Sequence, residues 1–189
     1  EAKPVSVGRP SMPLEVADDA ARFLGIKVVP GRIYAVLVGL RGAVHGMEER
    51  AADTSSDVST AQAIASLLRE ESGRWQPVAV GVSLAAAVDV FGTVRAARLL
   101  GWQGGNIAEA VRDATGLPAV GANDVDALAL SEHWFGHGRG THNFVVLTMG
   151  MGVGAGAIVE GTLVTGHQGA AAMLGRAWTS DGRTFHDVL

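Results

Sequence analysis

The pair Asn123-Asp124 is the first candidate for chemistry, because its residue types and its position both suit a polar site. The preceding residues 119–122 are apolar and β-like, whereas residues 125–135 have a helical pattern. A carboxylate at such a strand-to-helix junction can face a cleft, where it can accept a proton or bind a hydroxyl group. Asn and Asp are also preferred helix caps, so capping alone would explain the pair equally well. Both interpretations stay open at this stage.

The second candidate is the glycine-rich segment 150–156, which contains Gly150, Gly152 and Gly154. Glycine-rich turns let backbone amides come close to a phosphate group. In a Rossmann fingerprint the glycines open a helix, but here the sequence continues apolar and β-like through residues 157–159. The pattern therefore favours a bend between two strands. Its backbone would form a phosphate-binding turn or the vestige of one.

Metal and nucleic-acid chemistry find little support in the composition. The chain has no cysteine, which excludes disulfides and thiolate metal sites. His133 and His137 have a metal-binding spacing, but Gly136 and Gly138 indicate that the helix has already ended there. The 15 Lys and Arg residues are scattered and the formal net charge is -4. We predict that the chain holds no metal and no cofactor and does not itself bind nucleic acid.

The N-terminal part of the chain has the composition of a linker. Residues 1–21 contain three prolines and one glycine and show no periodicity up to Pro13, so we expect a linker from an upstream domain. No apolar run approaches the roughly 20 residues of a membrane span, and the start lacks a signal-peptide profile. We therefore expect a cytoplasmic protein that does not contact a membrane.

Hydrophobic periodicity predicts the elements that must position the two candidates. Three β-rich runs at residues 23–29, 33–40 and 43–47 suggest an antiparallel meander, followed by a helix over residues 57–71. The apolar run 78–82 predicts a strand covered on both faces. A helix, a strand and another helix then follow at residues 107–115, 119–122 and 125–135, and a second meander covers residues 143–149, 153–159 and 163–164. The four tryptophans are expected in core or hinge packing: Trp75, Trp102, Trp134 and Trp178.

These segments together resemble the ROK family of repressors, open reading frames and kinases over essentially the whole chain. The motifs that carry the resemblance are Gly8-Arg9-Pro10-Ser11, the segment ending in Gly101-Trp102, the pair Asn123-Asp124, and Gly150-x-Gly152-Val153-Gly154. The resemblance implies an α/β fold of the actin-like ATPase (ribonuclease H-like) type, built from duplicated β-β-β-α-β-α units. Residues 22–142 would form the first half, and residues 143–189 would begin an incomplete second half.

The chain departs from the kinases of this family at four places. Their Asp-x-Gly-Gly-Thr-Lys phosphate motif corresponds here to residues 27–32, which read Lys-Val-Val-Pro-Gly-Arg, so the carboxylate is lost. Met151 replaces a threonine of the second phosphate loop. Residues 172–176, including Met173 and Arg176, replace a Gly-Glu-x-Gly-His segment that holds sugar hydroxyls, and the zinc-binding cysteines are missing. The resemblance with these losses implies a regulator rather than an enzyme.

On this basis we expect the effector-binding module of a ROK-family repressor. A sugar-like ligand would enter the cleft between two actin-like halves, near Arg98, Asn123, Asp124, Met173 and Arg176, while Gly150, Gly152 and Gly154 would form a vestigial phosphate loop. An upstream winged helix-turn-helix, absent from this chain, would bind DNA in a homodimer or homotetramer. A ROK sugar kinase that phosphorylates a hexose with ATP is the alternative. A scaffold that binds no small molecule is a third possibility.

Overall fold

The computed structural model describes residues 13–150, 152–171 and 174–185. Its regular elements follow the predicted order with small shifts at their ends. They are β1 (Arg22–Val29), β2 (Arg32–Gly39), β3 (Val44–Ala51), α1 (Asp57–Glu70), β4 (Ala79–Leu84), α2 (Ile107–Thr115), β5 (Ala119–Asn123), α3 (Asp124–Trp134), β6 (Phe144–Met149), β7 (Val153–Val159) and β8 (Thr162–Leu163). Short 3-10 helices lie at Asp18–Ala20, Arg98–Leu100, His167–Gly169 and Leu174–Arg176.

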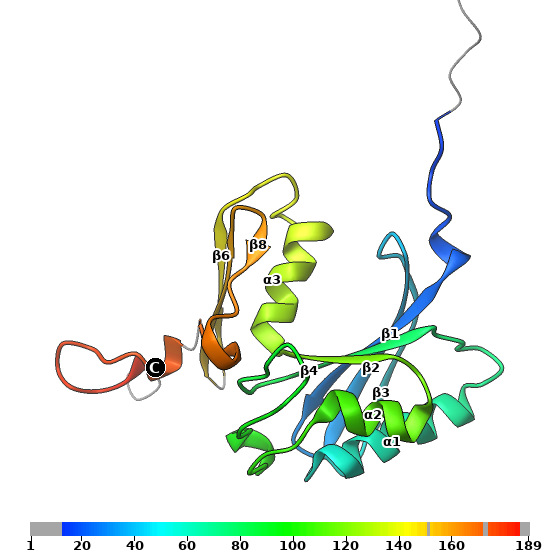
Figure 1. The fold of residues 1–189 in the computed structure, drawn as a ribbon, viewed down its shortest axis with the longest axis horizontal. Coiled ribbons are helices and arrows are strands. Elements are labelled where there is room, and N and C mark those ends of the chain that lie inside the picture. The colour runs from blue at the N-terminus through cyan, green and yellow to red at the C-terminus, as the bar shows by residue number, and fades with distance from the viewer. Residues whose placement is uncertain (1–12, 151, 172–173, 186–189) are drawn as a thin grey trace, which may run out of the picture.

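The first sheet has five strands in the order β3-β2-β1-β4-β5. The meander β1-β2-β3 is antiparallel, whereas β4 pairs parallel with both β1 and β5. Helices α1 and α2 provide the crossovers into β4 and β5 and lie together on one face of this sheet (Figure 1). The chain therefore contains the predicted β-β-β-α-β-α unit, and the α/β fold class is confirmed.

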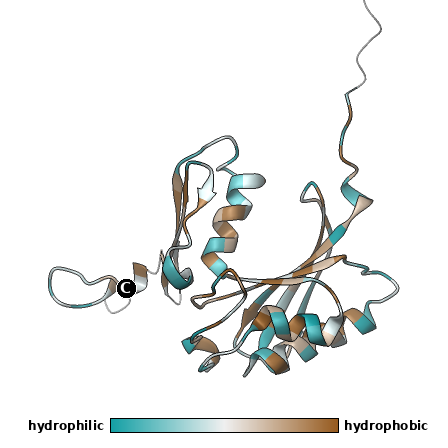
Figure 2. Cartoon of the chain, in the orientation of Figure 1, coloured by the Kyte–Doolittle hydropathy of each residue, from teal (hydrophilic) through white to brown (hydrophobic). Residues whose placement is uncertain are grey.

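The hydrophobic core lies between this sheet and the two helices. Leu24, Ile26 and Val28 of β1 alternate with more exposed residues, and the same alternation runs along β2 and β4. Helices α1 and α2 alternate hydrophobic with hydrophilic residues (Figure 2), as amphipathic helices do when one face is buried. The prediction that the strand after α1 is covered on both faces was wrong, because only every second residue of β4 is fully buried. The other face of β4 is not covered in the same way.

The third strand extends to Ala51 instead of ending at Met47. Its added residues pair with the start of β2, where Arg32 lies opposite Ala51 and Ile33 lies opposite Arg50. Because β3 is an edge strand, polar residues such as Glu48 and Glu49 are tolerated there. A hydrophobic pattern cannot detect a polar edge strand of this kind, which explains the difference in length.

The second sheet, in the order β6-β7-β8, is antiparallel and packs against α3. Two glycines of β7 permit this close packing. A Cβ atom at Gly156 would lie 2.8 Å from the backbone oxygen of Val125, and one at Gly154 would lie 2.7 Å from the Val125 Cγ2 atom. Such distances are shorter than normal van der Waals contacts, so larger side chains at these positions would push the helix away from the sheet.

Of the predicted linker, residues 1–12 lie outside the described part of the chain. Asp18 anchors the remainder to the turn between β2 and β3. Its carboxylate accepts the Arg41 backbone N–H at 2.8 Å and lies 2.7 Å from the Nε2 atom of His45, while its carbonyl accepts the Leu40 N–H at 2.9 Å. The contacts with Arg41 and His45 lower the pKa of the Asp18 carboxyl, with the His45 hydrogen bond as the largest cause. The entry into β1 is therefore held in a fixed position.

The tryptophan predictions were correct for two residues and wrong for two. Trp75 and Trp102 are buried, and the Trp102 indole donates to the Thr54 carbonyl at 2.8 Å. Trp134 and Trp178 are 63% and 75% exposed, because the first ends α3 and the second lies on a segment that extends away from both sheets (Figure 1). Among the described residues, no helix is both long enough and apolar enough to cross a membrane.

Candidate ligand-binding site

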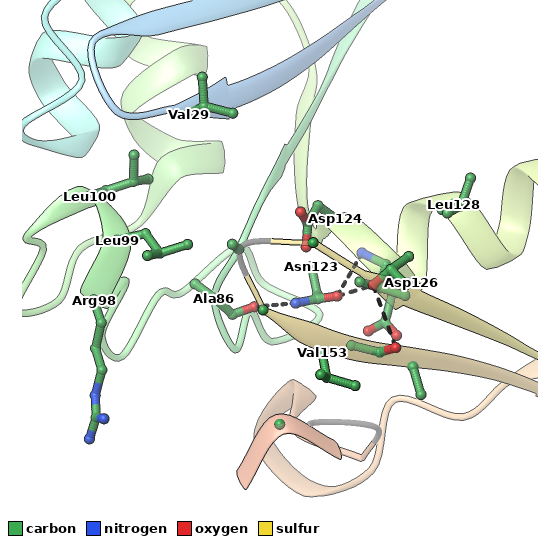
Figure 3. Close-up of a pocket in the computed structure, with 18 of the residues that line it drawn as sticks. Val29, Ala86, Arg98, Leu99, Leu100, Asn123, Asp124, Asp126, Leu128 and Val153 are labelled. Carbon is green, nitrogen blue, oxygen red and sulfur yellow. Dashed lines mark hydrogen bonds between the residues drawn. The ribbon is translucent and has the colours of Figure 1, made fainter. Parts of the chain in front are cut away.

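A cleft of about 1010 Å³ lies between the first sheet and the second sheet with α3 (Figure 3). Its walls come from the end of β1, the residues after β4, the 3-10 helix Arg98–Leu100, the first turns of α3, the β6–β7 turn and parts of the 169–184 segment. The parallel strands β1, β4 and β5 point their carboxyl ends towards it. Ligands of open α/β sheets bind at this kind of edge.

Asn123 ends β5 and caps α3. Its Oδ1 atom accepts the backbone N–H groups of Val125 and Asp126 at 2.8 and 3.2 Å, and its Nδ2 atom donates to the Ala86 carbonyl at 2.9 Å (Figure 3). The side chain therefore joins the loop after β4 to the start of α3. Capping is shown by these contacts, whereas binding of a ligand by Asn123 stays a prediction.

Asp124 is the first residue of α3, and its side chain is 19% exposed at the cleft. The Nζ atom of Lys27, from β1, lies 3.4 Å from the Asp124 Oδ2 atom. Lys27 also lines the cleft. An ammonium group from β1 and a carboxylate from α3 thus form an ion pair at the cleft.

Asp126 is a second acidic residue of the cleft that the sequence analysis missed. It is only 7% exposed and lines the same cavity as Asp124. Burial raises the pKa of its carboxyl to about 6, and the charge of Asp124 acts in the same direction. Residues two apart do not share a helix face, so helical spacing from Asp124 would have excluded Asp126. The structure brings both carboxyls to one cavity because the cleft lies at the beginning of the helix.

The glycines of the predicted phosphate loop have different environments. Gly150 and Gly152 form the turn between β6 and β7, where the Gly150 N–H donates to the Gly152 carbonyl at 3.1 Å. Both line the cleft, and a Cβ atom at Gly150 would meet nothing within 4 Å. Gly154 also lines the cleft, but its packing against α3 accounts for its lack of a side chain. The segment is the predicted bend between two strands.

The remaining predicted residues are placed only in part. Arg98 is exposed at the cleft wall, and its side chain is directed away from Asp124 in Figure 3. Met173 and the side chain of Arg176 lie outside the described part of the chain, although Gly175 lines the cleft. Trp178 and Thr184 complete the wall on that side. No spacing pattern pointed to Trp178, because it joins the cleft only through the fold of the 174–185 segment.

Within the described residues, no group of three or more His, Asp or Glu side chains is arranged to hold a metal ion. The pair His137 and Glu132 makes a local contact at 3.2 Å beyond the end of α3. The charged groups of the described cleft lining are Lys27, Asp124, Asp126 and Arg98, which can form hydrogen bonds and ion pairs with a ligand.

Comparison with known proteins gives a consistent family. The sequence model of the ROK family matches residues 24–182. The glucokinase of Streptomyces coelicolor is 32% identical over 153 residues, which cover 80% of this chain and 48% of that enzyme. The xylose repressor of Caldicellulosiruptor bescii is 27% identical over 175 residues, which cover 89% of this chain and 44% of the repressor.

Solved structures show the same two kinds of relative. A ROK family glucokinase from Streptomyces griseus, in complex with glucose and AMPPNP, superposes with a TM-score of 0.77 at 28% identity, covering 85% of this chain and 52% of the glucokinase. A ROK family transcriptional regulator, a homologue of the E. coli MLC protein, superposes with a TM-score of 0.80 at 23% identity. The match covers 93% of this chain and 48% of the regulator, and it shows that the fold is shared. The chain thus spans about half the length of these relatives.

Proposed function

The chain belongs to the ROK family, and from this premise we propose that it is the effector-binding module of a transcriptional repressor. A sugar or sugar-derived ligand enters the cleft and is held from the α3 side by Asp124. Closure of the cleft around the ligand changes the relative position of the two sheets, and this movement reaches a winged helix-turn-helix through the segment before β1. In this proposal DNA is bound through that other domain, within a homodimer or homotetramer.

The ion pair between Lys27 and Asp124 is the observation that carries the proposal. In a sugar kinase, a carboxylate at this position must be free to accept the proton of the attacking hydroxyl group. Here an ammonium group lies 3.4 Å from one of its oxygens and comes from the strand whose phosphate motif has changed. The arrangement suits an acceptor that binds a ligand hydroxyl and leaves it unmodified. Such a charged hydrogen bond contributes roughly 1.5–3 kcal/mol to binding.

A ROK sugar kinase remains the second candidate, and the 32% identity with a glucokinase over 80% of the chain favours it. The retained Asp124 would then act as the base. A coupled assay with ATP, Mg²⁺ and either glucose or xylose separates the two functions. We expect no turnover above the background of buffer alone. Turnover that disappears in Asp124→Asn and persists in the matched variant Asp113→Asn, on the exposed surface of α2, would establish the kinase instead.

A further inference from the structure

Asp126 has a combination of properties that its place in the fold does not require. Only 7% of the surface of this residue is exposed, yet it lines the open cleft. Its backbone N–H is engaged by the Asn123 cap. Among the residues that the structure describes, no donor reaches the Asp126 carboxyl, and Lys27 makes its ion pair with Asp124 instead. A buried carboxyl without a donor costs stability, and the open cleft beside Asp126 leaves room for a donor from a ligand.

The charges around the cleft limit what that partner can be. The other ionisable groups among the described lining residues are Asp124 on the same turn, Lys27 on β1 and Arg98 on its 3-10 helix, while β6 and β7 contribute uncharged residues. Lys27 and Asp124 compensate each other, and Arg98 is directed away from them (Figure 3). The local excess of charge beside Asp126 is therefore negative when its carboxyl is ionised. Such a position suits a hydrogen-bond donor and disfavours a phosphate or carboxylate.

We propose that Asp126 is a second ligand-binding carboxyl of the cleft, which accepts a hydrogen bond from a hydroxyl or ammonium group of the bound sugar. The inference rests on the proposed function, because it takes the same cleft as the ligand site. It adds a selection for neutral or amino sugars over phosphorylated ones at this end of the cleft. Asp124 and Asp126 would hold two different groups of one ligand, with Lys27 fixing the first carboxylate and burial isolating the second.

The proposal gives ligand binding a defined pH dependence. Burial raises the pKa of the free Asp126 carboxyl to about 6, and a donor from the ligand would favour the ionised form. Affinity should therefore be highest above pH 6 and fall as the pH drops through that value. If the donor moves the pKa of the bound carboxyl to 4 or below, the affinity at pH 5 is about tenfold weaker than at pH 7.5.

Isothermal titration calorimetry with glucose and with xylose, at pH 5 and pH 7.5, tests the inference. Wild-type protein should lose about tenfold in affinity at the lower pH. Asp126→Asn should bind with an affinity that differs by less than twofold between the two pH values. Asp89→Asn is the matched control and should behave as wild type, because Asp89 does not itself line the cleft although Ala85 and Ala86 of the same loop do. Glucose 6-phosphate should bind at least tenfold more weakly than glucose to wild type, and this difference should shrink in Asp126→Asn.

A second readout does not depend on the folding of the variant. Titrations of wild type at pH 6 in two buffers of different ionisation enthalpy report proton exchange, and binding should release about half a proton. A variant with the same pH dependence as wild type, or proton uptake on binding, would overturn the role of Asp126 and leave sugar binding intact. Failure of both sugars to bind at either pH would overturn the role of Asp126 and the proposed sugar sensor together.

Discussion

Replacement of Asp126 by Asn should alter the pH dependence of stability, even without ligand. The carboxyl has a pKa of about 6 in the folded protein, against 3.8 for an ordinary Asp. Because the folded-state pKa is raised, its contribution to stability is fully present below pH 3.8 and is lost as the pH rises through 6. Between pH 4.5 and 7.5 the linkage relation gives a loss of about 2 kcal/mol in the free energy of unfolding.

Asn cannot ionise, so this loss should be missing from the variant. The free energy of unfolding of Asp126→Asn minus that of wild type should be about 2 kcal/mol higher at pH 7.5 than at pH 4.5. The variant is then the relatively more stable protein at the higher pH. Urea titrations at both pH values, followed by the fluorescence of the buried Trp75 and Trp102, provide the measurement.

Asp89→Asn is the matched control for these titrations. The Asp89 carboxyl accepts the backbone N–H groups of Thr93 and Phe91, which lower its pKa, with the Thr93 contact as the largest cause. A carboxyl of this kind is mostly ionised in both folded and unfolded chains above pH 4.5, so the variant should show little change between the two pH values. A relative stability of Asp126→Asn that differs by less than about 0.5 kcal/mol between the two pH values would refute the burial argument.

Three further predictions concern the packing of α3, its cap and DNA. Gly156→Ala should lower the free energy of unfolding by about 1–3 kcal/mol, because the added Cβ would meet the Val125 carbonyl. The control Gly150→Ala should be nearly neutral in the same urea titration. Asn123→Ala should cost about 1 kcal/mol for the lost cap, measured by thermal unfolding against wild type. The chain alone should give no shift of duplex DNA in a gel at micromolar concentration; a shift that vanishes steeply with salt would contradict this.

Much of the fold could be predicted from the sequence because its signals are local. The bounds of α2 agree at both ends, since Asn106 caps its start and Gly116 ends it in a left-handed conformation with φ 73°. The polar end of β3 was missed, because an edge strand does not need the apolar alternation on which the prediction depended. Exposed Trp178 was also missed, since its surroundings depend on the long-range position of the 174–185 segment.

The site was predictable only where residue type and junction coincide. Asn123-Asp124 stood out because it follows a strand and begins a helix. The sequence singled out Lys27 only as a position at which the kinase motif would have a carboxylate. Nothing in the spacing indicated that its ammonium group would pair with Asp124, which lies almost one hundred residues later in the chain. Asp126 was hidden for a different reason, because burial and the absence of a described donor are properties of the packed chain. The assignment of Gly154 to a phosphate loop stays a prediction, and its close contact with α3 could not be read from the spacing.

The proposed function requires that the cleft binds a sugar and releases it chemically unchanged. Equilibrium dialysis of the protein with radiolabelled glucose or xylose, in the presence of ATP and Mg²⁺, followed by chromatography of the retained label, measures binding and chemistry together. We predict that at least one sugar is retained, that it is recovered without a phosphate group, and that Asp124→Ala retains none while Asp113→Ala retains as much as wild type. Recovery of a sugar phosphate in excess of the protein, or equal retention by Asp124→Ala, would contradict the claim.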